Sequence, residues 1–494
     1  MYFLGIDLGT SFIKLSLVDI TDGELFGDVK VPDSEMSIIA LHKGWAEQDP
    51  NLWWDYVCDG IHKLLHTNNL ENSTVQGIGI TYQMHGLVVV DKNGNTLRDA
   101  IIWCDSRAVH IGEEAANLLG AVYCQSNLMN APGNFTASKL NWVRLNEPDV
   151  YKNIFKFMLP GDFIAYKLTG KINTTITGLT EGIFWDFNKK EISKPLQEYF
   201  QIDSSLYPEI IPNYVNQGTV SLSAAKECGL KPGTPILFRS GDQPNNASSL
   251  NVFEPGQIAA TAGTSGVIYA ITEKDTVEEI HRVNNFAHVN YTLDSPSIGK
   301  LLCINSTGIL YRWLFENLSV SSYSEMNELS EKVPVGSDSL IILPFGNGSE
   351  RMLNNNHLGA QIINLDLNRH TKSHLCRAAL EGIAFSFYYG FEILKSDGIQ
   401  TNVIHAGNDN LFQSKVFSNT LCTLIGSDIK IFNTNGSIGA ARSCCIAGNG
   451  FEKYASFLEN DLATIYHPLQ ERSPFTNAYL AWKQVLNKNL NQKA

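Results

Sequence analysis

The sequence lacks the motifs of several common protein classes. Its nine cysteines include no Cys-x-x-Cys pair and no His/Cys cluster at zinc spacing, which argues against a zinc site or a dithiol centre. It has no Gly-x-x-x-x-Gly-Lys-Ser/Thr segment, which excludes a P-loop kinase. It also has no Gly-x-Gly-x-x-Gly fingerprint of a dinucleotide-binding domain.

Basic residues and long apolar segments are scarce as well. Lys and Arg number 37 against 50 Asp and Glu, and the net charge of −13 argues against a nucleic-acid partner. No apolar run approaches the roughly 18 to 20 residues that a membrane span requires. The start of the chain, Met1–Asp7, has no basic region of a signal peptide. We therefore expect a cytoplasmic protein without nucleic-acid or membrane partners.

The chain is long enough for two domains. Its 494 residues exceed what one hydrophobic core usually supports. Hydrophobic residues make up 44% and charged residues 18%, which is typical of a globular protein. No low-complexity linker divides the sequence. We expect two compact α/β domains, residues 1–245 and 246–494.

A strand–turn–strand pattern occurs twice. Tyr2–Asp7 has the composition of a buried strand, Leu8–Ser11 that of a tight turn, and residues 12–18 that of a returning strand. Ala262–Tyr269 repeats Gly-Thr-Ser in the same context near the middle of the chain. This repeat favours a duplicated architecture.

Both Gly-Thr-Ser turns suit a phosphate site. Glycine and small hydroxyl residues leave backbone N–H groups free to point at an anion. We predict that Thr10 and Ser11 face Gly263 and Thr264 across a cleft and clamp a polyphosphate. For either turn alone, an ordinary hairpin is an equally good interpretation.

Two aspartates follow predicted strands. Asp7 ends a buried apolar strand, where a carboxylate is costly unless it is paired or bound to a cation. Mg²⁺ beside a phosphate is the predicted compensation, and capping of the turn is the alternative. Asp242 follows the strand at 235–238 and is our candidate for the base of a phosphoryl transfer. From the residues alone, a simple turn aspartate is the favoured interpretation of Asp242.

Two further segments carry groups suited to a polyol. Gln83–Gly86 offers Gln and His donors and acceptors, although a lone His is more often structural. Trp103–Arg107 offers a tryptophan face for sugar C–H groups. A buried tryptophan beside a surface ion pair is the alternative there.

The second half contains two predicted helices. Residues 380–394 follow the i, i+3, i+4 pattern, and Gly398 lies where a C-terminal cap belongs. The small residues of Gly436–Ala441 predict a helix that another backbone can approach closely.

Taken in order, these motifs resemble the FGGY carbohydrate kinases of the sugar kinase/Hsp70/actin superfamily. The resemblance implies an α/β fold with two actin-like (ribonuclease H-like) domains, an interdomain cleft, and an ATP-dependent sugar kinase that uses Mg²⁺. The matching segments run over nearly the whole chain: Gly5–Ser11, Trp45–Pro50, Trp53–Trp54, Gln83–Gly86, Trp103–Arg107, Leu159–Phe163, Gly241–Asp242, Gly263–Ser265, Glu381–Ala384 and Gly439–Ala441.

Within the family, Gln83–Gly86 is most similar to the xylulokinase group, which implies phosphorylation of D-xylulose in pentose catabolism. Asp242 is then the catalytic base, and a homodimer is expected. The resemblance assigns the sugar to Met84, His85, Trp103, Asp242 and Gln243. It assigns ATP to Thr10, Ser11, Gly263, Thr264, Gly407 and Asn410, and the metal to Asp7.

Three departures weaken the substrate assignment. Gln243 stands where that group commonly has Asn, and glycerol kinases carry Gln there. His405–Gly407 replaces a Gly-Gly-Gly turn, and Gly348–Leu353 replaces a Gly-Glu-Arg-Thr-Pro stretch. A kinase for another polyol, such as ribulose or glycerol, therefore stays open. A non-kinase actin-like ATPase or sugar sensor is a remote alternative.

Overall fold

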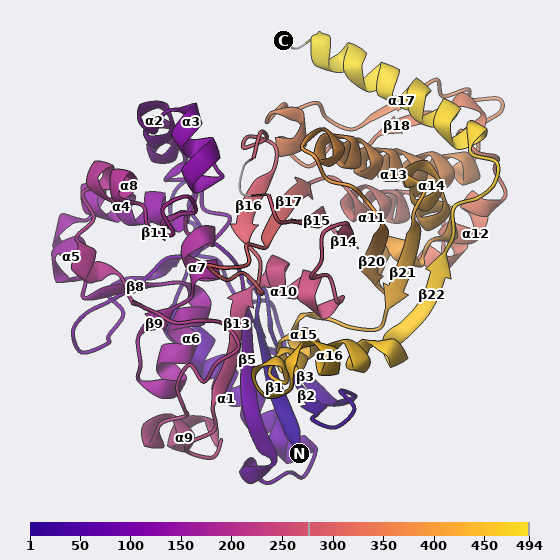
Figure 1. Ribbon diagram of the computed structural model, residues 1–494. Helices are drawn as coiled ribbons and strands as arrows, with labels where there is room; N and C mark the ends of the chain where they lie inside the picture. Colours follow the sequence, from indigo (N-terminus) through magenta and orange to yellow (C-terminus); the bar gives the residue numbers. More distant parts are fainter. Residues whose placement is uncertain (275–276, 493–494) are drawn as a thin grey trace.

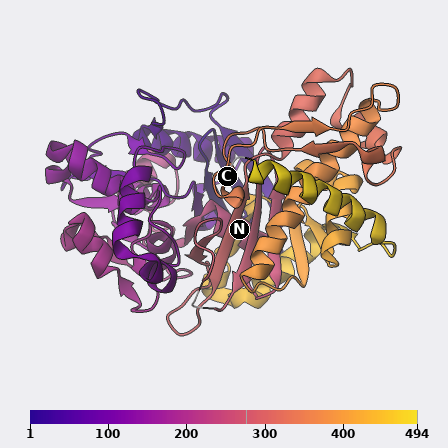
Figure 2. The same ribbon diagram turned by 90° about the horizontal axis from the view of Figure 1, so that it is seen from above.

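The computed structural model describes residues 1–274 and 277–492 as two α/β halves, which stand side by side when seen from above (Figure 2). Each half is built on a mixed sheet with helices against its faces (Figure 1). Among the described residues, no helix has the length and apolarity to cross a membrane.

The first sheet confirms the strands expected from the N-terminal sequence. Its order is β13-β5-β1-β2-β3. The strand β2 pairs antiparallel with β1 and with β3, whereas β5 pairs parallel with β1 and with β13. Its strands are β1 (Tyr2–Leu8), β2 (Ile13–Asp19), β3 (Leu25–Val31), β5 (Val75–Tyr82) and β13 (Ile236–Gly241).

The second sheet repeats this plan. The β14–β15 hairpin corresponds to β1–β2, and β20 and β21 continue it in parallel as β5 and β13 do in the first half. The strands in sheet order are β16 (Asn284–Ala287), β17 (Ile298–Ile304), β15 (Gly266–Thr272), β14 (Gln257–Ala262), β20 (Val403–Gly407), β21 (Asp428–Phe432) and β22 (Leu462–Tyr466). The duplication predicted from the two Gly-Thr-Ser turns is confirmed.

Helices of the first half begin and end at recognisable signals. Asp49 caps α1 by accepting the Asn51 N–H, and Pro50 occupies its first turn, where no N–H is needed. The main helices are α1 (Pro50–Thr67), α2 (Val109–Leu119), α4 (Thr136–Asn146), α5 (Pro148–Asn153), α6 (Pro160–Thr169), α7 (Ile176–Glu181), α8 (Lys194–Phe200), α9 (Leu222–Cys228) and α10 (Asp242–Ser249).

The helix predicted at 380–394 lies within α13, and Gly398 follows its end with a φ of +85°, as a C-terminal cap requires. The helices of the second half are α11 (Gly308–Asn317), α12 (Tyr323–Glu331), α13 (Lys372–Ser396), α14 (Lys415–Ile425) and α17 (Ser473–Asn491).

A late helix, α15 (Gly436–Ser443), packs on the sheet of the first half, and α16 (Ile446–Leu458) follows it in the chain (Figure 1). A Cβ at Gly5 would lie 1.8 Å from the Ser437 carbonyl oxygen, and one at Gly79 would lie 1.9 Å from that of Ala440. The close backbone approach predicted for this helix is therefore confirmed, and glycine is required on the strands as well.

Candidate active site

The first Gly-Thr-Ser turn joins β1 to β2 and is anchored by its neighbours. The Gln48 amide donates to the Thr10 carbonyl at 2.8 Å, and the Thr10 hydroxyl donates to Gln83 Oε1 at 3.3 Å. The Ser11 carbonyl accepts the Met36 N–H at 2.9 Å. The turn is thus held in one conformation from both sides.

The second turn, at Gly263 and Thr264, is held in a corresponding way by residues that the sequence analysis did not single out. The Thr307 hydroxyl donates to the carbonyls of Gly263 and Thr264 at 2.7 and 3.1 Å. The Gly308 N–H donates to the Gly263 carbonyl at 2.9 Å. A Cβ at Gly308 would lie 2.5 Å from that oxygen, so the start of α11 must be glycine.

A cavity of about 340 Å³ opens beside the second turn. It brings together Gly263, Thr264 and Asn410, three of the residues predicted for ATP, whereas Gly407 is not among the described residues that line it. Aromatic, amide and guanidinium groups complete the wall: Tyr311, Arg312, Tyr323, Asn327 and Gln413. Such groups suit a planar base with hydrogen-bonding edges.

Asp7 at the end of β1 and Asp242 at the start of α10 lie within electrostatic reach of each other. Burial raises the pKa of Asp242 to about 7, and the charge of Asp7 adds to this shift, while hydrogen bonds from Gln243 oppose it. Burial raises the pKa of Asp7 to about 6, and the charge of Lys14 lowers it in part. The Asp242 carboxyl group, at the amino end of α10, can therefore gain or lose a proton near neutral pH.

The surroundings of these two carboxylates fit a divalent cation. A Cβ at Gly436 would lie 2.7 Å from Asp7 Oδ2, so this glycine keeps the space beside the carboxylate open. Among the described residues, no group of three or more His, Cys, Asp or Glu side chains could hold a metal. A cation beside Asp7 would therefore take most of its oxygen ligands from phosphate and water, as Mg²⁺ commonly does.

His85 follows β5 with a left-handed backbone, φ +62°. Its Nδ1 lies 2.8 Å from the Glu181 carbonyl, which can only accept, so Nδ1 carries the proton. Burial, chiefly, lowers the pKa of His85 to about 3, so the ring is neutral and Nε2 is an acceptor. The ring packs against Phe135 and Phe286, with centroids 4.9 and 5.4 Å away.

Glu181, which the sequence analysis missed, lies among the predicted sugar residues. Its Oε1 accepts the His85 N–H at 3.3 Å, and its Oε2 lies 2.5 Å from where a Cβ at Gly241 would be. Met84 Cγ is 2.6 Å from the same position. Burial raises the pKa of Glu181 well above its usual range.

Trp103 follows β7 (Ala100–Ile101) and is 52% exposed. Its indole N–H donates to the Thr10 hydroxyl at 2.9 Å, so the ring lies beside the first Gly-Thr-Ser turn. The alternative of a buried tryptophan with a surface ion pair is wrong, because the ion pair is the buried part: Asp105 and Arg107 have almost no exposed side-chain surface.

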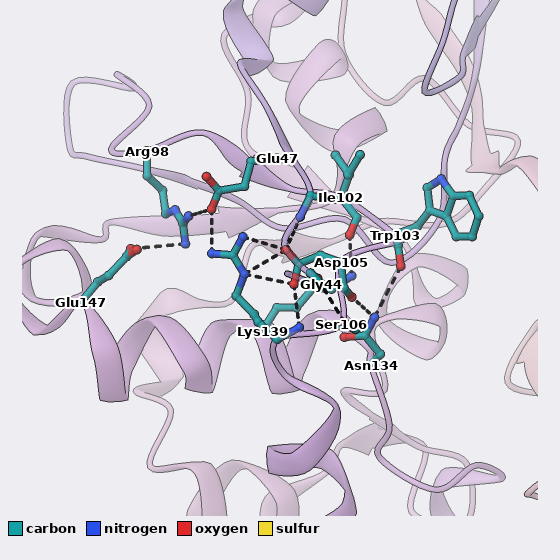
Figure 3. Close-up of polar contacts among 12 residues, drawn as sticks. Gly44, Glu47, Arg98, Ile102, Trp103, Asp105, Ser106, Asn134, Lys139 and Glu147 are labelled. Carbon is teal, nitrogen blue, oxygen red and sulfur yellow. Dashed lines mark hydrogen bonds and ion pairs between the residues drawn. The ribbon is translucent and has the colours of Figure 1, made fainter. Parts of the chain in front are cut away.

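A buried network of charges fixes the loop that carries Trp103 (Figure 3). Asp105 accepts the Ala46 N–H at 2.6 Å and two guanidinium N–H groups of Arg107 at 2.7 to 3.0 Å. Arg107 also pairs with Glu47 at 2.7 Å and lies 3.7 Å from the ring centroid of Trp45. Any movement that separated these groups would leave a buried charge unpaired, which is costly. The network therefore holds the loop in one conformation.

Comparison with known proteins assigns the chain to a family. The N-terminal domain model of the FGGY family of carbohydrate kinases matches residues 2–247, and the C-terminal domain model matches residues 258–448. The chain belongs to this family. It is a carbohydrate kinase, and the predicted α/β fold with two actin-like domains is confirmed.

Among individual relatives, the FGGY kinase is 29% identical over 413 residues to the xylulose kinase of Haemophilus influenzae, with 81% of each chain covered. The structure of xylulose kinase from Rhodospirillum rubrum matches with a TM-score of 0.86 at 23% identity over 99% of each chain. Plasmodium falciparum glycerol kinase with ADP matches with a TM-score of 0.87 at 20% identity, covering 99% of this chain and 98% of its own. Kinases named for different substrates share the fold, so the fold alone does not identify the sugar.

Proposed function

We propose that this FGGY kinase transfers the γ-phosphoryl group of ATP to the terminal hydroxyl of D-xylulose, giving D-xylulose 5-phosphate and ADP. The observation that carries the proposal is Asp242, a carboxyl group with a pKa of about 7 at the amino end of α10, directly after Gly241, which packs against Met84 and Glu181. The relative named xylulose kinase in Haemophilus influenzae supports the choice of sugar. Cytoplasmic location and a homodimer stay predictions from the sequence.

The groups around Asp242 define what the sugar must offer. The neutral His85 ring presents Nε2 as an acceptor, so a sugar hydroxyl would donate to it. Gln243 supplies both a donor and an acceptor, and Trp103 a flat apolar face. Met84 limits the width of the pocket beside Gly241. Asp242 accepts the proton of the attacking hydroxyl as its oxygen bonds to phosphorus.

The nucleotide would lie across both halves. We place its base in the cavity beside Tyr311 and Asn410, and its phosphates between the turn at Gly263–Thr264 and the turn at Thr10–Ser11. Asp7 would hold Mg²⁺, directly or through water, and the bound ion would offset the negative charge of the phosphates. The turn N–H groups would stabilise charge on the transferring group.

A substrate panel tests the proposal. ADP release with Mg·ATP is measured with D-xylulose, D-ribulose, L-ribulose, L-xylulose, glycerol and gluconate. We expect the highest kcat/KM for D-xylulose. Preference for glycerol would instead favour the second candidate that Gln243 suggests, a kinase for another polyol. Equal ADP release with and without every sugar would contradict the proposed transfer.

The pH dependence of kcat/KM should report the base. Because Asp242 must be ionised to accept a proton and its pKa is about 7, kcat/KM is expected to fall about tenfold for each pH unit below 7 and to level off above it. The measurement is kcat/KM for the preferred sugar from pH 5.5 to 9, at constant ionic strength. A profile that is flat down to pH 5.5 would contradict the role of Asp242.

A further inference from the structure

Lys139, in the middle of α4, is a buried lysine that the mechanism above does not use. Its side chain is fully enclosed, and its ammonium group donates to two backbone carbonyls, that of His85 at 2.8 Å and that of Ile102 at 3.0 Å. An ammonium group is costly to bury, and these two hydrogen bonds offset part of that cost. Figure 3 shows Lys139 beneath the loop of Ile102 and Trp103.

These two carbonyls belong to the two loops that carry the proposed sugar contacts. His85 lies in the loop after β5, and Ile102 directly precedes Trp103 in the loop after β7. The loops are separate in sequence and come from different strands. Lys139 therefore joins them through a single side-chain group that donates a charge-assisted hydrogen bond to each.

The contacts continue from these loops to the first Gly-Thr-Ser turn. Trp103 donates to the Thr10 hydroxyl, and Thr10 donates to Gln83 at the start of the loop that contains His85. Together with Lys139, these hydrogen bonds close a ring. The ring fixes the spacing between an aromatic face, an imidazole acceptor and the turn proposed to bind phosphate.

We propose that Lys139 is a positioning residue for the sugar, which sets the distance between the His85 loop and the Trp103 loop without touching the substrate. The inference rests on the proposed sugar site. Asp105 lies close enough for its charge to favour the ammonium form, whereas burial opposes it and lowers the pKa of Lys139 to about 7. The two contacts do not depend on that pKa, since a neutral amine can also donate to both carbonyls; the Ile102 carbonyl additionally accepts the Asp105 N–H at 3.2 Å.

Lys139→Met removes both donors and keeps the length of the side chain. With the two loops no longer joined, KM for the sugar is expected to rise about tenfold or more, the size of effect that loss of a hydrogen bond to a charged group produces. KM for ATP is expected to rise less than KM for the sugar, because the cavity proposed for the base lies beside Asn410 in the other half and only the Thr10 turn belongs to the ring. Lys139→Arg, which keeps a charged donor, is expected to recover part of the loss.

Lys156 provides the matched control. It lies on β8 (Lys156–Met158) in the same half, and its ammonium group also donates to two carbonyls, those of Ser205 and Tyr207, at 2.7 and 2.6 Å. Neither carbonyl belongs to a proposed sugar loop. Lys156→Met is therefore expected to lower the melting temperature by as much as Lys139→Met does, or by less, and to leave KM for the sugar unchanged.

A double-mutant cycle with Trp103→Phe separates positioning from general loss of structure. Phenylalanine keeps an aromatic face but cannot donate to Thr10, so it opens the same ring at another point. If the ring acts as a unit, the two changes in sugar KM will not be additive. Should Lys139→Met fail to fold, Lys139→Gln, which keeps two N–H donors, takes its place in the cycle.

Two results would overturn the proposal: an unchanged sugar KM in folded Lys139→Met, or equal rises in the KM for sugar and for ATP. The assays use whichever panel sugar the wild-type enzyme phosphorylates fastest. A preference for a sugar other than D-xylulose thus contradicts the proposed substrate, while the role of Lys139 is still tested.

Discussion

Asp242→Asn is expected to lower kcat by about 10²- to 10⁴-fold while the sugar still binds. Asparagine has the same shape and can still hydrogen bond to a hydroxyl, but it cannot accept the proton. Because burial raises the pKa of Asp242 to about 7, the site already accommodates the neutral carboxyl group near neutral pH as well as the carboxylate, and asparagine is neutral and of the same shape. Folding should therefore be largely unaffected. ADP release gives kcat, and calorimetric titration gives the affinity for the sugar.

Asp28→Asn serves as the control for this substitution. Asp28 lies on β3 of the same sheet, and its side chain is exposed, so the same chemical change should leave kcat within about twofold. Turnover close to the wild-type value in Asp242→Asn would mean that another group takes the proton. Loss of sugar binding in that variant would instead mean that Asp242 acts chiefly by holding the substrate.

Gly5→Ala is expected to destabilise the protein by about 3 kcal/mol or more, at the upper end of what overpacking usually costs. The new Cβ would lie 1.8 Å from the Ser437 carbonyl oxygen and 2.8 Å from the Ala441 nitrogen. Both are backbone atoms of α15, so no side-chain rotation can relieve the clash, and the helix must move off the sheet. The measurements are the soluble yield and the melting temperature. A free energy of unfolding is not the readout, because a protein of this size need not unfold in two states.

Gly448→Ala is the matched control for the change in stability. Gly448 lies in α16, and a Cβ at this position meets no heavy atom within 4 Å. Gly448 precedes the kink at Gly450, and because no neighbouring atom opposes the added methyl group, this variant should be about as stable as the wild type. A melting temperature for Gly5→Ala equal to that of the wild type would contradict the packing described for α15.

Features that depend on local pattern were predictable from the sequence. Apolar runs identified β1 and β5, and the repeated Gly-Thr-Ser motif identified the two hairpins and the duplicated plan. The small residues of Gly436–Ala441 indicated close packing, because only side chains of that size allow it. The partner of that helix, the first sheet, could not be read from the pattern.

Features that depend on which distant segments meet were not predictable. Glu181 ends the short helix α7, and its sequence neighbours give no sign that its carboxyl lies between His85 and Gly241. Lys139 looks like an ordinary helix residue until the two loops that it joins are placed. The Trp103 segment shows the same difficulty, because a Trp-Cys-Asp-Ser-Arg sequence does not reveal which of its members is buried.

The position of α15 has a consequence for how the protein is made. The strands β1 and β5 are synthesised first, but the helix that covers their glycines ends at Ser443, near the close of the chain. During translation, the face of that sheet stays without its cover until most of the second half has left the ribosome. The nascent first half therefore depends on late residues for its core, and a chain that stops before Gly436 would expose that face to other proteins.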